Sequence, residues 1–292
     1  MAVRAFFLAA FYFSAALFAK EPLSLWNEGA AKQKILAFVK DVEKIPVEDR
    51  IAVFDQDGTL WVEKPLYTQL YFALDKGKVS PERAESMTPQ EIEKLVAASF
   101  SGMTVEAYRK EVSEWLKKAK HPRFNRPFLE LVYTPMLELI KLLKEHKFKV
   151  YIVSGGGQEF IRSYAKDVYG LPPEQIIGSA GKLKYKDKKL LKLPDVLFID
   201  DKAGKPEAIS LMIGKRPYAA FGNSTGDKEM LEWNQGLSLL VHHDDAVREY
   251  SYGENSKIGH FPASLMETAK KNNWVVVSMK KDWKEIFSEP QK

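Results

Sequence analysis

The sequence predicts an α/β fold with a doubly wound parallel sheet, and three observations support this prediction. Short apolar runs of strand length alternate with segments of helical periodicity from residue 134 onward. Acidic, serine and glycine residues directly follow several of these runs, as in residues 51–60, which read IAVFDQDGTL. The chain has 292 residues, 45% of them hydrophobic, which is enough for a core with helices on both faces of a sheet.

The first residues predict a signal peptide that spans residues 1–19. Arg4 precedes an apolar stretch, residues 5–18, that is short for a bilayer span, and Ala19 is a small residue suited to cleavage. An uncleaved anchor is the alternative. The chain contains no cysteine, so neither disulfides nor a lipid-modified cysteine at the cut can form. We therefore expect an exported protein, periplasmic or secreted, with no stable membrane insertion after cleavage.

The charge pattern favours a small anionic partner over a nucleic acid. The net charge is +5 at pH 7, and the lysines are spread along the chain with one local run at residues 182–192. Arginine-rich or arginine-aromatic patterns typical of nucleic-acid binding do not occur. A mildly basic protein attracts anionic substrates, although this field alone identifies none of them.

The first expected elements are helices around one strand. Apolar periodicity predicts a helix over residues 26–43, which Pro46 ends, and residues 51–54 form a short buried strand. Residues 62–128 contain no convincing strand. Their helix start and stop signals instead predict three helices, over residues 67–74, 89–100 and 105–118. This segment is therefore expected to be a helical insertion after the first strand.

Strands and helices then alternate, as in a parallel sheet that is covered on both faces. The expected strands are residues 149–153, 176–178, 196–199, 218–221, 237–241 and 274–278. The expected helices are residues 135–145, 158–169, 206–213 and 228–233. A lysine-rich hairpin is expected over residues 183–191.

Two acids follow the first strand directly. Asp55 and Asp57 stand two residues apart, and Gly58 and Thr59 then turn the chain. The carboxyl end of a strand in such a sheet faces the ligand crevice. Two carboxylates there can act as nucleophile and as proton donor while they share one metal ion. An aspartate-rich turn without chemistry is the simpler alternative.

Further polar groups follow the later strands or open a helix. Ser154 and Gly155 can hold phosphate oxygens, because glycines let the backbone come close to an anion. Lys205, at an expected helix start, can offset negative charge. Asn223 and Asp227, with the first aspartate and the backbone carbonyl of the second, supply hard oxygen ligands that suit Mg²⁺. The sequence therefore predicts a site for a phosphate and a divalent cation.

These motifs, in this order and after these strands, resemble those of phosphatases of the haloacid dehalogenase superfamily. The matching segments are residues 55–59 (DQDGT), Ser154, Lys205 and residues 222–227 (GNSTGD), within a core match over residues 50–245. The chain looks most similar to exported, phosphoserine-phosphatase-like members. The resemblance implies a Rossmann-like core, formed by residues 20–61 and 129–292, and a helical cap over residues 62–128.

The resemblance also implies Mg²⁺-dependent hydrolysis of small phosphomonoesters in two steps. Asp55 would attack phosphorus and form an aspartyl-phosphate, and Asp57 would protonate the leaving oxygen and then activate water. A phosphomutase shares both acids and is the alternative enzyme. A protein that binds a phosphate ligand without turnover is the alternative outside catalysis. A dehalogenase fits less well, because that reaction has no use for Asp57 or for the fourth motif.

Two assignments within this site stay open. Many members of the superfamily carry an acid where Asn223 stands, so either Asn223 or Asp227 is the direct metal ligand. Lys202 competes with Lys205 for the role of phosphate-binding lysine. Lys205 is favoured because Lys205-Pro206 stands where a helix begins.

Acids and histidines after other strands are weaker candidates. Asp200 and Asp201 end an apolar run. They either bind the metal or support its ligands from behind, or they form a solvated strand end. Residues 242–245 (HHDD) could indicate a second metal. Neighbouring residues on a strand point to opposite faces, so His242 and His243 are not expected to chelate one ion. A role in the site is the less favoured interpretation, and within it a supporting hydrogen bond fits better than metal ligation.

The residues just after the first motif are candidates for a substrate pocket. Trp61, Glu63, Tyr67 and Gln69 stand where the insertion begins. An aromatic pocket with a carboxylate would suit a cationic leaving group. The alternative is that the aromatic residues form the core of the insertion itself. His260 is expected to be a loop histidine.

Overall fold

The computed structural model describes residues 21–84 and 86–289 of the chain. The predicted signal peptide, residues 1–19, lies outside this part, so export stays a prediction. Within the described ranges, none of the helices combines the length and the apolar character that crossing a membrane requires.

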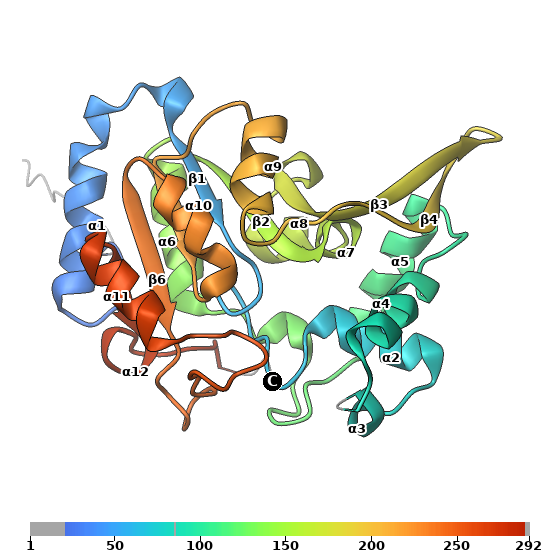
Figure 1. The fold of residues 1–292 in the computed structure, drawn as a ribbon. Helices are drawn as coiled ribbons and strands as arrows, with labels where there is room; N and C mark the ends of the chain where they lie inside the picture. Colours follow the sequence, from blue (N-terminus) through green and yellow to red (C-terminus); the bar gives the residue numbers. More distant parts are fainter. Residues whose placement is uncertain (1–20, 85, 290–292) are drawn as a thin grey trace, which may run out of the picture.

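A seven-stranded sheet forms the centre of the molecule (Figure 1). Its strands are β1 (Ile51–Phe54), β2 (Lys149–Gly157), β3 (Ile176–Lys186), β4 (Lys189–Phe198), β5 (Ala219–Gly222), β6 (Leu237–His242) and β7 (Val275–Ser278). They lie in the order β4-β3-β2-β1-β5-β6-β7. Neighbouring strands are parallel, except β3 and β4, which are antiparallel. Since β1 is central and the chain winds outward on both sides, the predicted doubly wound α/β fold is confirmed.

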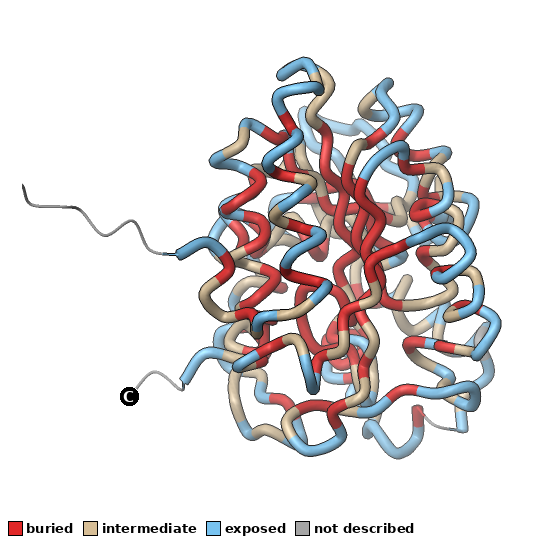
Figure 2. The backbone as a smooth tube through the Cα atoms, turned by 90° about the vertical axis from the view of Figure 1, so that its left-hand side faces the viewer, coloured by how far each residue is buried: buried red, intermediate tan, exposed pale blue. Residues whose placement is uncertain are grey.

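Helices cover both faces of this sheet, because successive strand residues point to opposite sides. From β1, Ala52 and Phe54 join one apolar core, and Ile51 and Val53 join the other. The helices on the first face are α1 (Ala30–Lys40) and α6 (Thr134–Glu145), and those on the second are α9 (Gly204–Met212), α10 (Lys228–Trp233) and α11 (Ala263–Lys271). Figure 2 shows the buried strands between these partly exposed helices.

β3 and β4 extend away from the sheet as a two-stranded arm, which projects at the upper right of Figure 1. The hairpin predicted over residues 183–191 is confirmed, and Asp187 and Lys188 form its turn with φ values of 50° and 62°. The prediction of a separate strand over residues 196–199 is wrong, since these residues largely continue β4, with Phe198 opposite Ala180. Pro194 reads as a break in sequence, but an edge strand tolerates proline.

The predicted helix over residues 158–169 is two short helices instead, α7 (Gln158–Arg162) and α8 (Ala165–Tyr169). Between them Tyr164 leaves the helical conformation, with φ at −138°. Its buried ring stacks on Trp61, with the ring centroids 4.8 Å apart. This packing contact holds Tyr164 outside the helical conformation, so the segment forms two helices.

The segment between β1 and α6 contains four α-helices in its described part and lies beside the arm (Figure 1). It contains α2 (Thr68–Gly77), α3 (Pro81–Ala84), α4 (Pro89–Ala98) and α5 (Val105–Leu116). Backbone hydrogen bonds join it to the arm: the Gly102 N–H donates to the Lys192 carbonyl at 2.9 Å, and the Lys192 N–H donates to that of Met103 at 2.8 Å. The domain boundaries at residues 62 and 128 stay predictions.

The two ends of the described chain lie side by side. The Asn27 N–H donates to the carbonyl of Asp282, at the end of α12 (Met279–Asp282), over 2.8 Å. Next to this contact, the ring of Trp26 meets that of Trp283 edge-on, with centroids 5.9 Å apart. Both tryptophans are buried, so this junction belongs to the core.

Candidate active site

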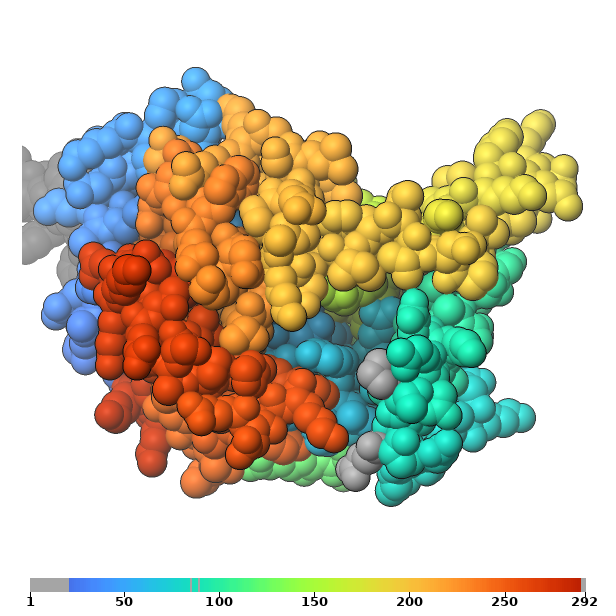
Figure 3. Space-filling view, in the orientation of Figure 1, coloured from blue at the N-terminus to red at the C-terminus, as the bar shows by residue number. Residues whose placement is uncertain are grey.

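A cavity of about 490 Å³ opens where the parallel strands end, between the sheet, α4 and the arm. Figure 3 shows the hollow between the body of the molecule and the helical segment, drawn in teal. Six of the residues predicted for the site line it: Asp55, Asp57, Ser154, Gly155, Lys205 and Asp227. Segments far apart in sequence meet here because parallel strands deliver their carboxyl ends to one edge.

Lys205 joins the first and the last motif. Its buried ammonium, carried by α9, donates to Asp55 Oδ1 and to Asp227 Oδ1, both at 2.6 Å, and to the Val153 carbonyl at 3.0 Å. Burial would lower the pKa of Lys205, but the charges of Asp227 and Asp55 hold it above its ordinary value. The ammonium is therefore permanently charged. Lys202, the competing lysine, is exposed to solvent.

The two acids after β1 stand in different surroundings. Burial, with the charge of Asp227, raises the pKa of Asp55 well above its usual range, and Lys205 opposes this shift. Burial also raises the pKa of Asp57 to about 6, although the Trp61 Nε1–H donates to Asp57 Oδ1 at 2.6 Å and so favours its ionised form. Asp57 can therefore hold a proton close to neutral pH, as a general acid must.

Asn223 and Asp227 also differ in their surroundings. Asp227 Oδ2 accepts hydrogen bonds from the backbone N–H groups of Asn223, at 2.8 Å, and Ser224, at 3.0 Å, while its other oxygen meets the lysine. The side-chain oxygen of Asn223 lies 3.2 Å from the Thr59 hydroxyl, which is also 3.3 Å from Asp55 Oδ2. Asn223 thus presents an oxygen beside Asp55, whereas Asp227 holds the turn and the lysine.

The oxygen atoms that Asp55 and Asn223 present at this end of the cavity fit Mg²⁺. The oxygens of Asp55 and Asn223 are the hard ligands that this ion prefers. Burial, together with the charge of Asp227, raises the pKa of Asp55, and a bound cation would favour its ionised form. In the described ranges, no three His, Cys, Asp or Glu side chains are grouped as a metal site. Amide, backbone and water oxygens would therefore have to complete the coordination.

A buried carboxylate fixes the backbone of Ser154. The Ser154 N–H donates to Asp200 Oδ2 at 3.0 Å, and the Ser154 hydroxyl oxygen accepts from the Gly156 N–H at 3.1 Å. Asp200 is fully buried, so it is not a solvated strand end. Burial raises its pKa to about 7. Asp201, by contrast, is exposed at the lining of the cavity.

The two neighbouring histidines diverge, as expected from strand geometry. His243 is fully buried: its Nε2 lies 2.6 Å from the Gly58 carbonyl and its Nδ1 3.0 Å from Glu249 Oε2. His242 stacks instead on Phe261, with centroids 4.7 Å apart. His243 therefore holds the loop that carries Asp57 in place through a hydrogen bond.

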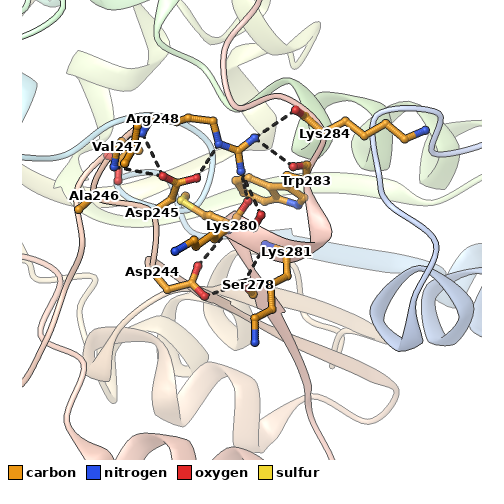
Figure 4. Close-up of polar contacts among 12 residues, drawn as sticks. Asp244, Asp245, Ala246, Val247, Arg248, Ser278, Lys280, Lys281, Trp283 and Lys284 are labelled. Atoms are coloured by element: carbon orange, nitrogen blue, oxygen red, sulfur yellow. Dashed lines mark hydrogen bonds and ion pairs between the residues drawn. The ribbon is translucent and has the colours of Figure 1, made fainter.

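Asp244 and Asp245 serve the C-terminal part of the chain (Figure 4). Asp244 accepts hydrogen bonds from the Ser278 hydroxyl at 2.5 Å and from the Lys280 N–H at 3.0 Å. Asp245 Oδ2 accepts from Arg248 Nε at 2.5 Å. Both carboxylates are engaged in these hydrogen bonds, so they do not form the second metal site that residues 242–245 could have indicated.

The residues after the first motif separate into core and cavity. Trp61 is buried against Tyr164 and lies outside the cavity lining, whereas Glu63, Tyr67 and Gln69 belong to that lining. Glu63 Oε1 accepts from Asn223 Nδ2 at 2.7 Å. A methyl group on Gly58, whose φ is 78°, would lie 2.1 Å from that nitrogen. His260 stands in an exposed loop, as expected.

Two contributions to this site were not predicted from the sequence. Thr59, although it belongs to the first motif, was given no role beyond the turn, yet its hydroxyl lies between the oxygens of Asp55 and Asn223. The second is an apolar wall that α4 and β4 build opposite the acids. No local signal reveals this wall, because it exists only where the arm meets the helices.

The family model of haloacid dehalogenase-like hydrolases matches residues 52–232. A protein of unknown function from Bordetella pertussis Tohama I aligns with 78% of this chain and 97% of its own, at 14% identity and a TM-score of 0.53. A functionally unknown protein from Anaerococcus prevotii DSM 20548 aligns over 90% and 95%, at 16% identity and the same TM-score. A phosphoserine phosphohydrolase-like protein from Francisella tularensis subsp. tularensis SCHU S4 aligns over 78% and 94%, at 15% identity and a TM-score of 0.43. No curated protein matches the chain.

Proposed function

Since this chain belongs to the haloacid dehalogenase-like hydrolase family, we propose that it is a Mg²⁺-dependent phosphatase of small phosphomonoesters. The observation that carries the proposal is the contact of Lys205 with both Asp55 and Asp227. Beside it stands a second acid, Asp57, whose pKa burial raises to about 6. A carboxylate approaches a phosphate dianion only where positive charge offsets their repulsion. The buried lysine supplies such charge at the strand end.

Asp55 acts as the nucleophile in the proposed reaction. Its carboxylate attacks phosphorus and forms an aspartyl-phosphate, while the bond from phosphorus to the leaving oxygen breaks. Asp57 gives its proton to that oxygen and later takes one from the water that hydrolyses the intermediate. Ser154 and the Gly155 backbone hold the phosphate oxygens, and His243 keeps the Asp57 loop in position.

Asp55, Asn223 and the Asp57 backbone carbonyl would hold Mg²⁺, with Asp227 in support through the turn and the lysine. When bound, the ion supplies further positive charge to the phosphate. We also propose that the protein is exported after cleavage near Ala19. The mass of the protein isolated from the periplasm or the medium of its host would test this.

The first test is phosphate release by the chain from Lys20 onward, with Mg²⁺ and with a chelator. Asp55→Asn keeps the shape of the side chain but removes the nucleophile, so activity should fall by at least ~10³-fold. Asp41→Asn, at an exposed position, is the matched control and should leave the rate unchanged. Unaltered phosphate release by folded Asp55→Asn would refute the proposed function. Isomerised product without free phosphate would assign a phosphomutase instead.

A further inference from the structure

The cavity is acidic at its inner end but apolar along its outer wall. Six side chains contribute to this wall: Leu70 from α2, Ile92 and Val96 from α4, Phe100 just after it, and Val196 and Phe198 from β4. A volume of about 490 Å³ lies within the range of pockets that enclose a small organic ligand. A phosphate group alone would leave most of this space, and the whole wall, unused.

Part of this apolar wall is exposed to solvent. Val196 is 44% exposed and Ile199, which also lines the cavity, is 56% exposed. Apolar surface that gathers at the mouth of a cavity marks a place where a ligand or partner binds. Since the wall continues directly into the acidic end, one molecule with a phosphate head and an apolar body would cover both.

The charges of the cavity exclude a second anion on that molecule. Among the described residues that line it, Lys205 is the single basic one, and it already meets two carboxylates. Seven lining residues are acidic, and three of them, Glu93, Asp195 and Asp201, are exposed around the rim. A carboxylate or second phosphate on the leaving group would find no cation to pair with and would face these acids.

The buried lysine of the adjoining cavity, Lys192, is turned elsewhere. Lys192 lines an adjoining cavity of about 460 Å³ and is absent from the lining of the first one. Its ammonium lies 4.5 Å from the ring centroid of Phe100 and 4.8 Å from that of Tyr108. These cation-π contacts engage Lys192 in holding the arm against α5, which leaves the apolar wall as the surface for the leaving group.

We propose that the substrate is the phosphate monoester of an apolar alcohol, alkyl or aryl, that carries no second negative charge. This inference rests on the proposed function and specifies its substrate class. The bond from phosphorus to the alcohol oxygen breaks as the bond to the Asp55 carboxylate forms. The alcohol oxygen receives the proton of Asp57, so the alcohol leaves neutral. Water then cleaves the acyl phosphate, which releases inorganic phosphate and restores Asp55.

The test is kcat/KM for a series of n-alkyl phosphates from ethyl to hexyl. These esters share the same reactivity at phosphorus, so differences among them report the burial of the chain. We expect kcat/KM to rise by about two- to fourfold per methylene, as burial of apolar surface predicts. The same six-carbon chain ending in a carboxylate should fall at least tenfold below hexyl phosphate.

Val196→Ser tests the wall, and Val247→Ser is the matched control. Val247 is 86% exposed and lies outside the cavity lining. We expect Val196→Ser to flatten the rise with chain length, so that its loss of kcat/KM relative to wild type grows from ethyl to hexyl phosphate. Val247→Ser should leave the whole series unchanged. In a Lys192→Met variant, kcat/KM for the carboxylate-ended ester should also stay at least tenfold below that for hexyl phosphate.

The outcomes separate this inference from the proposed function. Phosphate release with no rise along the series, or with a preference for the carboxylate-ended ester, would overturn the substrate class and leave the phosphatase standing. Absence of release from every ester, by folded protein with Mg²⁺, would overturn both. A rise with chain length that Val247→Ser removes as fully as Val196→Ser would also overturn the assigned wall.

Discussion

A single buried carboxylate, Asp200, links the phosphate end of the site to the stability of the fold. It accepts the N–H of Ser154, yet its Oδ1 has no hydrogen-bond partner among the residues that the structure describes. Burial raises its pKa from an ordinary value of 3.8 to about 7. An ionised carboxylate without full hydrogen bonding is costly in such surroundings, so this side chain favours the protonated form.

We predict that Asp200 makes a pH-dependent contribution to stability, which Asp200→Asn removes. Between about pH 4 and pH 7 the folded protein keeps a proton that the unfolded chain has lost. The free energy of unfolding therefore falls as pH rises through this window, by ~2–4 kcal/mol. Chemical denaturation at pH 4.5 and pH 8 should show Asp200→Asn more stable than wild type at the higher pH, with the difference shrinking at the lower one.

The exposed Asp41→Asn variant serves as the control for this measurement. Its carboxylate is in water, so its profile should follow that of the wild type. If the free energy of unfolding of Asp200→Asn depended on pH as strongly as that of wild type, a group other than Asp200 would be responsible.

At the scale of elements, α5 depends on Thr104 at its start. The Thr104 side chain accepts the Ala107 N–H at 3.1 Å, and its backbone pairs with Leu191 of the arm. The same residue thus begins a helix and closes the contact between the helical segment and β4. Local capping and long-range pairing therefore coincide at one position.

We predict that Thr104→Ala lowers the free energy of unfolding by ~1 kcal/mol, the usual effect of losing such a cap. Thr104→Ser keeps the hydroxyl and should stay close to wild type. Hydrogen exchange gives the direct readout, because the amide of Ala107 should exchange faster in the alanine variant alone. Equal exchange at Ala107 in both variants would contradict the capping role.

At the scale of the whole molecule, Arg248 ties the C-terminal segment to the core (Figure 4). Its guanidinium donates to the carboxylate of Asp245 and to carbonyls that follow β7, including those of Met279 at 2.7 Å and Trp283 at 3.1 Å. Trp283 in turn packs on Trp26. The contacts of Arg248 therefore also support the first segment of the described chain.

We predict that Arg248→Met lowers the free energy of unfolding by ~2–4 kcal/mol, because it leaves one oxygen of the Asp245 carboxylate and several carbonyls without their side-chain donor. Arg248→Lys, which keeps the charge but not the planar set of donors, should lose less. Denaturant titrations followed by tryptophan fluorescence would measure both. A methionine variant as stable as wild type would show that these contacts carry no net stability.

Local sequence patterns were sufficient for the sheet strands near the site. A four-residue apolar run followed by two acids predicts both β1 and the position of Asp55, because strand length and the turn are encoded within a few residues. Lys205 was preferred over Lys202 from its place at a helix start, and it is the lysine that meets Asp55. These features depend on neighbours in sequence.

The arm shows where local patterns were insufficient. Two apolar runs separated by a proline predict two separate elements. Both belong to β4, because β3 pairs with residues on either side of the proline. The break in the predicted helix over residues 158–169 arises in the same way, from the packing of Tyr164 on Trp61. Neither partner is near in sequence.

The sequence by itself therefore determined the α/β class, the central strand with its acids, and the family motifs. Tertiary structure alone decided that His243 reaches the carbonyl of Gly58, 185 residues away, and that Asp200 is buried under Ser154. It also decided that α4 and β4 build an apolar wall of the cavity. The physical reason is that periodicity and turn chemistry act over a few residues, whereas burial and pairing depend on which distant segments meet.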